Sequence, residues 1–194
     1  MNFLAHLFLS RENEELMIGN FIADSVKGHA FDQYSLGIKN GILLHRKIDA
    51  FTDAHPVFLN SVVRLRMRHR KYAGVITDII YDHFLASCWN EFAADSLDEF
   101  TEKIQTQLIE NKDLMPQRSQ RFLDYMLREN IPVSYATLEG IEKVLYGMSR
   151  RAKFENSMHV AGQDLAKDYR LFEEDFRKFF PSIIQFTEKE KRGR

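Results

Sequence analysis

The sequence is poor in the residues that cross-link or interrupt a chain. Cys88 is the only cysteine among 194 residues, which excludes a disulfide within the chain. Four prolines and nine glycines leave few breaks in regular structure. The apolar segment from Phe3 to Leu9 is too short to span a bilayer, and it lacks the cationic start and cleavage site of a signal peptide. We therefore expect a cytoplasmic protein with no membrane contact.

The sequence also lacks an excess of charge of one sign. The formal net charge of -1 gives no support for nucleic acid binding, and composition leaves the oligomeric state open. Hydrophobic residues make up 44% of the chain, which is enough for a core, and the length suits one domain. We predict a single domain over residues 1–186, followed by a charged, flexible tail over residues 187–194.

Apolar side chains recur with the period of 3.6 residues that is typical of α-helices, and no segment alternates as a strand does. We therefore predict an all-α fold, a single-domain bundle of roughly seven or eight helices. Asp53 is placed to cap a helix that starts near Pro56, and Pro181 is expected to end the last helix. The expected helices cover or include residues 14–27, 36–50, 57–70, 73–92, 97–108, 116–127, 138–148 and 165–179.

Acidic and imidazole side chains fall on the apolar faces of these helices. His45 and Asp49 are four residues apart and continue the apolar row of Ile38 and Ile42. In the expected helix over residues 14–27, Asp24 lies on the same face as Met17 and Phe21. A buried carboxylate is costly unless it is paired or bound to a cation, so these positions need a partner.

The predicted helix over residues 73–92 is apolar nearly all round, which indicates a central position. It carries Asp78, Asp82 and His83. A helix cap or an arginine pair would explain any one acid alone. A divalent cation better explains the whole set, because clustered carboxylates repel one another. The candidate metal-binding residues are Asp24, His45, Asp49, Asp78, Asp82 and His83.

The remaining histidines lie in different sequence surroundings. His6 lies between Leu4 and Leu7 and is either a further ligand or a core histidine. His55 precedes a proline and is expected in a loop, whereas His29, His69 and His159 lie in polar surroundings and are expected at the surface. A mixed set of imidazoles and carboxylates suits Mn²⁺, Fe²⁺, Zn²⁺ or Mg²⁺ rather than a thiolate-bound ion. Mn²⁺ is favoured, with Mg²⁺ and Fe²⁺ as alternatives.

Basic residues gather in residues 64–71, where five cations alternate with apolar side chains. A solvated helix face is the ordinary explanation, but the interleaved apolar residues also suit docking of an acidic partner. The candidate docking residues are Arg64, Arg66, Arg68, Arg70 and Lys71. Farther along, Arg150 and Arg151 follow a helix and either stabilise its carboxyl end or hold a phosphate.

With these residues in place, the chain resembles the acyl carrier protein phosphodiesterase family. The resemblance covers residues 1 to about 151, and its most specific parts are the two segments with the acid and histidine residues. The matching segments are residues 1–7 (MNFLAHL), 19–24 (GNFIAD), 44–56 (LHRKIDAFTDAHP), 70–74 (RKYAG), 78–85 (DIIYDHFL), 138–141 (LEGI) and 148–151 (MSRR).

The resemblance implies an atypical member of the helical HD phosphohydrolase superfamily, since this sequence contains Asp82-His83 but no His followed by Asp. The implied activity is metal-dependent hydrolysis of the phosphodiester between 4′-phosphopantetheine and a serine of holo acyl carrier protein. Arg46, Arg150 or Arg151 would then stabilise charge on the phosphate, and Asp78 would orient the water or move a proton. Two alternatives remain at this point, namely an HD-type hydrolase of nucleotides or other small phosphoesters and a non-catalytic helical binding module.

Overall fold

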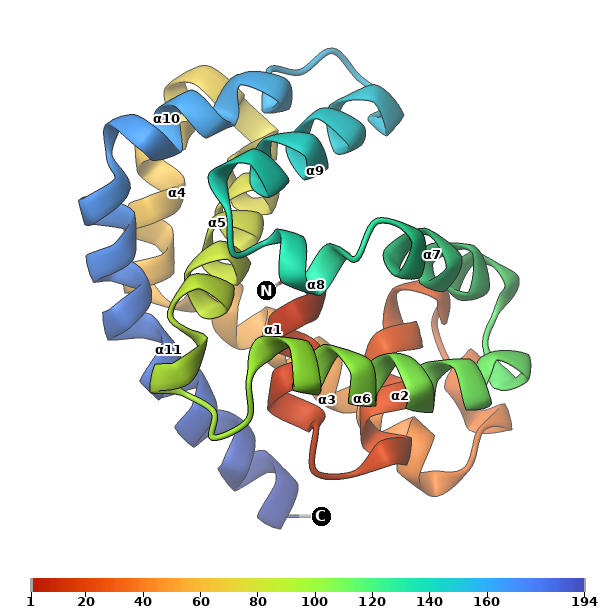
Figure 1. Cartoon of the computed structure of the whole chain (residues 1–194). Helices are drawn as coiled ribbons and strands as arrows, with labels where there is room; N and C mark the ends of the chain where they lie inside the picture. The colour runs from red at the N-terminus through yellow and green to blue at the C-terminus, as the bar shows by residue number, and fades with distance from the viewer. Residues whose placement is uncertain (1, 194) are drawn as a thin grey trace.

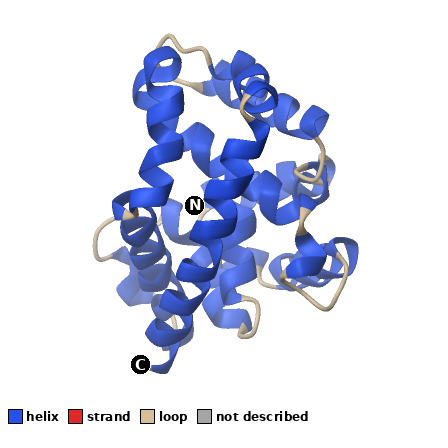
Figure 2. Ribbon diagram, turned by 90° about the vertical axis from the view of Figure 1, so that its left-hand side faces the viewer, coloured by secondary structure: helices blue, strands red, loops and turns tan. Residues whose placement is uncertain are grey.

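The computed structural model describes residues 2–193, and these residues form helices and loops without a β-strand (Figures 1 and 2). The prediction of an all-α fold is therefore confirmed, with more helices than the seven or eight expected. The α-helices are α1 Phe3–Ser10, α2 Glu14–Ile22, α3 Leu36–Ala54, α4 Pro56–His69, α5 Ala73–Ser87, α6 Leu97–Glu110, α7 Gln117–Arg128, α8 Ile131–Ser134, α9 Leu138–Arg151, α10 Ala161–Lys167 and α11 Tyr169–Arg192. Among the described residues, no helix is both long and apolar enough to cross a membrane.

The additional helices come from three places. The opening segment forms α1, which the 3.6-residue period could not reveal because nearly every residue of α1 is apolar and buried. Pro132 lies in the first turn of α8, where its missing N–H would have no partner within the helix, so it is compatible with a helix start. The predicted last helix is divided at Asp168 into α10 and α11.

Several predicted boundaries also differ. His55, not Asp53, caps α4, since its Nδ1 accepts a hydrogen bond from the backbone N–H of Val57 at 3.3 Å. α5 ends at Ser87 instead of residue 92. α11 continues through Pro181 to Arg192, so most of the predicted flexible tail is helical, with Thr187 buried. Arg194 lies outside the described residues.

α1 lies in the middle of the molecule, where it packs against α2, α3 and α5 (Figure 1). Its amino end is held by Asp82 of α5, which is fully buried. The two carboxylate oxygens of Asp82 accept hydrogen bonds from the backbone N–H groups of Leu4 at 2.8 Å and Ala5 at 3.1 Å. Because the first N–H groups of a helix have no partner within it, Asp82 serves as a cap supplied by a neighbouring helix.

α2 and α3 approach each other closely through two glycines. A side-chain carbon on Gly19 would lie 2.0 Å from the carbonyl oxygen of Ile38, and one on Gly41 would lie 2.2 Å from that of Leu16. Only glycine therefore permits this backbone contact. The contact places Asn20, the residue after Gly19, against His45, which follows Gly41 by one helical turn.

Candidate metal centre and its pocket

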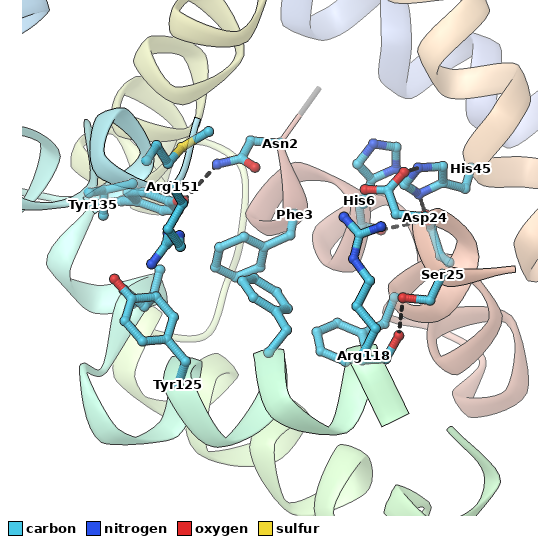
Figure 3. Close-up of a pocket in the computed structure, with 17 residues that line it drawn as sticks. Asn2, Phe3, His6, Asp24, Ser25, His45, Arg118, Tyr125, Tyr135 and Arg151 are labelled. Carbon is cyan, nitrogen blue, oxygen red and sulfur yellow. Dashed lines mark hydrogen bonds and ion pairs between the residues drawn. The ribbon is translucent and has the colours of Figure 1, made fainter. Parts of the chain in front are cut away.

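Four side chains with metal-ligating groups meet where α1, α2 and α3 come together. Asp49 of α3 bridges the two imidazoles, since its Oδ1 lies 3.1 Å from Nε2 of His6 and its Oδ2 lies 3.1 Å from Nε2 of His45. Asp24, in the 3-10 turn after α2, brings Oδ1 to 3.4 Å from the same His45 nitrogen. The rings of His6 and His45 stack with centroids 3.9 Å apart. We call these four residues the metal cluster, of which Figure 3 shows His6, His45 and Asp24.

Asn20 keeps a proton on Nδ1 of His45. The Asn20 amide nitrogen donates to the backbone oxygen of His6 at 3.0 Å and to the hydroxyl of Ser10 at 3.3 Å. The amide oxygen of Asn20 must therefore face Nδ1 of His45, 2.9 Å away, and it accepts a hydrogen bond from the N–H group at Nδ1. This leaves Nε2 of His45 directed at Asp24 and Asp49. A hydrogen bond that holds Nδ1 in this way is the usual support of a metal-binding histidine.

The electrostatics of the cluster are dominated by its carboxylates. Burial lowers the pKa of His45, but the carboxylates of Asp24 and Asp49 outweigh it and raise this pKa to about 9. Burial would raise the pKa of Asp49, yet hydrogen bonds with His45 and His6 keep it far below the ordinary value. Burial and the charge on His45 lower the pKa of His6 to about 4. The cluster thus holds one positive charge between two carboxylates.

The donor set fits a divalent cation. One ligand atom from each of His6, His45 and Asp49 lies within 4.8 Å of the others, which is close enough for the three residues to hold one ion together. A cation there would take the place of the proton on His45. Two imidazoles with one or two carboxylates suit Mn²⁺, Fe²⁺ or Zn²⁺, and the side chain of Asp24, which is 81% exposed, remains open toward the pocket.

Two of the predicted α5 residues make their contacts outside this cluster. Both oxygens of Asp82 are occupied by the amino end of α1. His83 donates from Nδ1 to the carbonyl of Tyr135 at 2.7 Å and accepts at Nε2 from the hydroxyl of Tyr169 at 2.9 Å. Asp78 lies one turn before Asp82, where burial raises its pKa to about 6 and the charge of Asp49 contributes to this rise. Asp82 and His83 are thus separated from the cluster, and His6 joins it.

A pocket of about 310 Å³ opens from the metal cluster (Figure 3). Its walls come from segments that are far apart in the sequence, because α1 and α2 face α7, α8 and α9 across it. The lining is largely apolar, with polar groups at its two ends. The lining residues are Asn2, Phe3, His6, Asn20, Phe21, Asp24, Ser25, His45, Arg118, Ser119, Phe122, Tyr125, Ile131, Tyr135, Val144, Met148 and Arg151.

The predicted phosphate-binding arginines have three different positions. Arg46 donates to the backbone oxygens of Val26 at 3.0 Å and Gly28 at 3.1 Å, so it holds the loop after α2. Arg150 is exposed and does not line the pocket. Arg151 does line it, with its guanidinium 5.1 Å from the ring centre of Tyr125. Of the three, only Arg151 can reach a ligand in this pocket.

Arg118 is the functional candidate that the sequence did not reveal. It follows the start of α7 and extends its guanidinium across the pocket toward Asp24 and His6 (Figure 3). The signal in the sequence is weak, since Arg118 differs from the other arginines of α7 only by sharing a face with Phe122 and Tyr125. Its role follows from the pocket, which residues distant in sequence build.

The predicted docking surface on α4 is partly used within the fold. Arg64 forms an ion pair with the buried Asp175 of α11, and Arg68 contacts both oxygens of Asp164 at 3.1 Å. His69, expected at the surface, is buried and lies 2.8 Å from Asp164. The other three cations, Arg66, Arg70 and Lys71, are exposed, and two of them, Arg70 and Lys71, line a separate hollow. None of the five predicted docking residues lines the pocket of the metal cluster.

Replacement of Asn20 with Ala is expected to weaken binding of Mn²⁺ by about 10- to 100-fold, because His45 loses the group that holds its Nε2 toward Asp49. Titration with Mn²⁺ followed by calorimetry measures this change. Asn60→Ala, at an exposed position of α4, is the matched control and should bind Mn²⁺ as the wild type does. Equal affinities in the Asn20 variant and the wild type would show that the cluster does not depend on this support.

Comparison with known proteins places the chain in a family. The family model described as acyl carrier protein phosphodiesterase matches residues 1–183. A protein of that name from Photorhabdus laumondii subsp. laumondii is 33% identical over 189 residues, which cover 97% of this chain and 96% of the relative. Its namesakes from Serratia proteamaculans and Escherichia coli O6:H1 are 33% and 32% identical over 95% of this chain and 96% of their own lengths. No solved structure matches the chain significantly. The chain belongs to the acyl carrier protein phosphodiesterase family.

Proposed function

We propose that this protein is a metal-dependent phosphodiesterase that releases 4′-phosphopantetheine from holo acyl carrier protein and leaves the apo protein. The observation that carries the proposal is the metal cluster at the end of a pocket, in a chain whose relatives are named for this carrier. Mn²⁺ is the proposed ion, with Mg²⁺ and Fe²⁺ as alternatives. Two imidazoles in the donor set favour Mn²⁺ or Fe²⁺ over Mg²⁺.

The residues of the pocket have different roles in the proposed reaction. His6, His45 and Asp49 would hold the ion, and Asn20 orients His45. When bound, the ion would supply a water nucleophile near neutral pH and positive charge for the phosphate. The exposed carboxylate of Asp24 faces the pocket and accepts the proton of the attacking water, the role first assigned to Asp78. Arg118 binds the phosphate oxygens and stabilises the charge that develops there.

The direct test follows the mass of holo acyl carrier protein incubated with the protein and Mn²⁺. We expect loss of the 4′-phosphopantetheine mass, no loss when EDTA is present, and recovery when Mn²⁺ is restored. An intact carrier with a folded, Mn²⁺-loaded protein would contradict the proposal. Turnover of small phosphodiesters or nucleotides with the carrier untouched would instead assign the metal cluster to a small-molecule hydrolase.

The exposed cations of α4 and of the 3-10 turn Arg70–Tyr72 that follows it are proposed to contribute long-range attraction of the acidic carrier. Combined replacement of Arg66 and Lys71 with Ala is expected to raise KM for the carrier a few-fold at low salt and leave kcat unchanged. The difference should vanish at high ionic strength, because exposed charges are screened. Lys103→Ala, an exposed cation of α6, is the control. An unchanged KM at low salt would remove α4 from the docking surface.

A further inference from the structure

The pocket beyond the metal cluster has an aromatic wall in its middle. Phe122 of α7 packs edge-to-face on Phe3, with ring centres 5.3 Å apart, and lies 5.7 Å from Phe21 in a stacked arrangement. Phe122 is 36% exposed although it belongs to this aromatic group. A large apolar side chain left open inside a pocket offers a surface for an apolar part of a ligand.

The end of the pocket opposite the metal cluster is polar but carries no acidic residue (Figure 3). Arg151 is exposed, and its guanidinium lies over the ring of Tyr125. Asn2 donates to the hydroxyl of the buried Tyr135 at 2.6 Å. Guanidinium, amide and phenol groups at one place suit neutral carbonyl and amide groups of a ligand, because together they supply donors and acceptors.

The pocket therefore presents three kinds of surface in a fixed order. The metal cluster and Arg118 come first, the aromatic wall follows, and the polar end with Arg151 comes last. A 4′-phosphopantetheine arm has its groups in the same order, with the phosphate first, a dimethyl-substituted carbon next to it, and two amides beyond. A volume of about 310 Å³ is within the range of small-molecule sites.

We propose that this pocket binds the pantetheine arm of the substrate, with its dimethyl group on Phe122 and its amides at Arg151 and Asn2. The inference rests on the proposed function, since that function supplies the substrate. It assigns specificity to the arm itself: the protein selects its phosphodiester by contacts with the arm, in addition to any contact with the carrier. A phosphodiester without the arm would use the metal cluster and Arg118 but gain nothing from the aromatic wall.

The test uses pantetheine, which has the arm but no phosphate, titrated by calorimetry into the full-length protein loaded with Mn²⁺. We expect saturable binding to the wild type and a dissociation constant raised roughly tenfold in Phe122→Ala, because the apolar contact is lost. Arg151→Ala should weaken binding at the other end of the arm. Tyr146→Ala removes an exposed aromatic ring of α9 that does not line the pocket, and it should bind as the wild type does.

A second readout is KM for the holo carrier, which should rise in Phe122→Ala and stay at the wild-type value in Tyr146→Ala. A Mn²⁺ content equal to that of the wild type shows that Phe122→Ala is folded. No binding of pantetheine to the wild type, or equal binding by Phe122→Ala, would overturn the arm site even if the carrier is cleaved. Pantetheine binding that depends on Phe122, with the carrier left intact, would support the arm site and overturn the proposed function.

Discussion

Replacement of Asp49 with Ala is expected to lower turnover of the holo carrier by on the order of 1,000-fold, which exceeds the 10- to 100-fold typical of a lost supporting hydrogen bond. Asp49 is the only residue of the metal cluster whose carboxylate contacts both imidazoles, at 3.1 Å from each. Without it, a divalent ion would lose a charged ligand from the centre of the site. Metal content and turnover should therefore fall together, as measured by elemental analysis and by the mass of the carrier.

Asp53→Ala is the matched control for this experiment. Asp53 lies one turn farther along α3 and is exposed, so the replacement removes the same charge from the same helix without touching the cluster. We expect its metal content and turnover to match the wild type. Retention of both properties by the Asp49 variant would place the ion elsewhere in the molecule.

Replacement of Arg118 with Ala is expected to lower kcat by about 100- to 1,000-fold while the metal content stays at the wild-type level. The guanidinium faces the metal cluster from the opposite wall of the pocket, where the phosphate would lie (Figure 3). Arg118→Lys should recover only part of the rate, since an ammonium group cannot bind two phosphate oxygens as a guanidinium does. Single-turnover measurements with holo carrier separate this effect from weaker binding.

Arg121→Ala provides the comparison on the same helix. Arg121 is exposed, three residues beyond Arg118, and does not line the pocket. Its loss should change kcat by less than about twofold. A similar decrease in both variants would mean that α7 contributes general positive charge, and an unchanged kcat in Arg118→Ala would remove this residue from the reaction.

The part of the site on α3 could be predicted from the sequence alone. His45 and Asp49 continue an apolar row at helical spacing, and the structure places them where that row faces α1 and α2. Spacing within one helix is a local property, so periodicity reveals it. Asp24 was also predicted, although it reaches the cluster from a 3-10 turn after α2 ends instead of from a continuous helix.

The separation of α5 from the metal cluster could not be predicted in this way. Asp82 and His83 lie on a buried helix, as expected, but burial does not specify a partner. Asp82 is used by the amino end of α1, 78 residues away in sequence, and His83 by Tyr135 and Tyr169. The opening helix that supplies His6 was itself hidden, because a segment apolar on all sides has no amphipathic period.

The basic residues of α4 show the same limit. Arg64 and Arg68 alternate with apolar residues, yet their partners lie 111 and 96 positions away on α11 and α10. A run of basic residues in the sequence identifies the cations, but it does not identify the acidic residues that the fold brings next to them. Arg118 was missed for the same reason, since its position opposite the metal cluster depends on how α7 packs across the pocket from α1 and α2.

The proposed function depends on a divalent metal centre held by His6, His45 and Asp49. The most direct measurement is the ratio of bound metal to protein, by elemental analysis, for wild type and His45→Ala purified without chelator and dialysed against Mn²⁺. We expect close to one ion per chain in the wild type and almost none in the variant, with cleavage of the holo carrier lost in parallel. Equal metal content in the two proteins, or full carrier cleavage by wild-type protein stripped of metal, would contradict it.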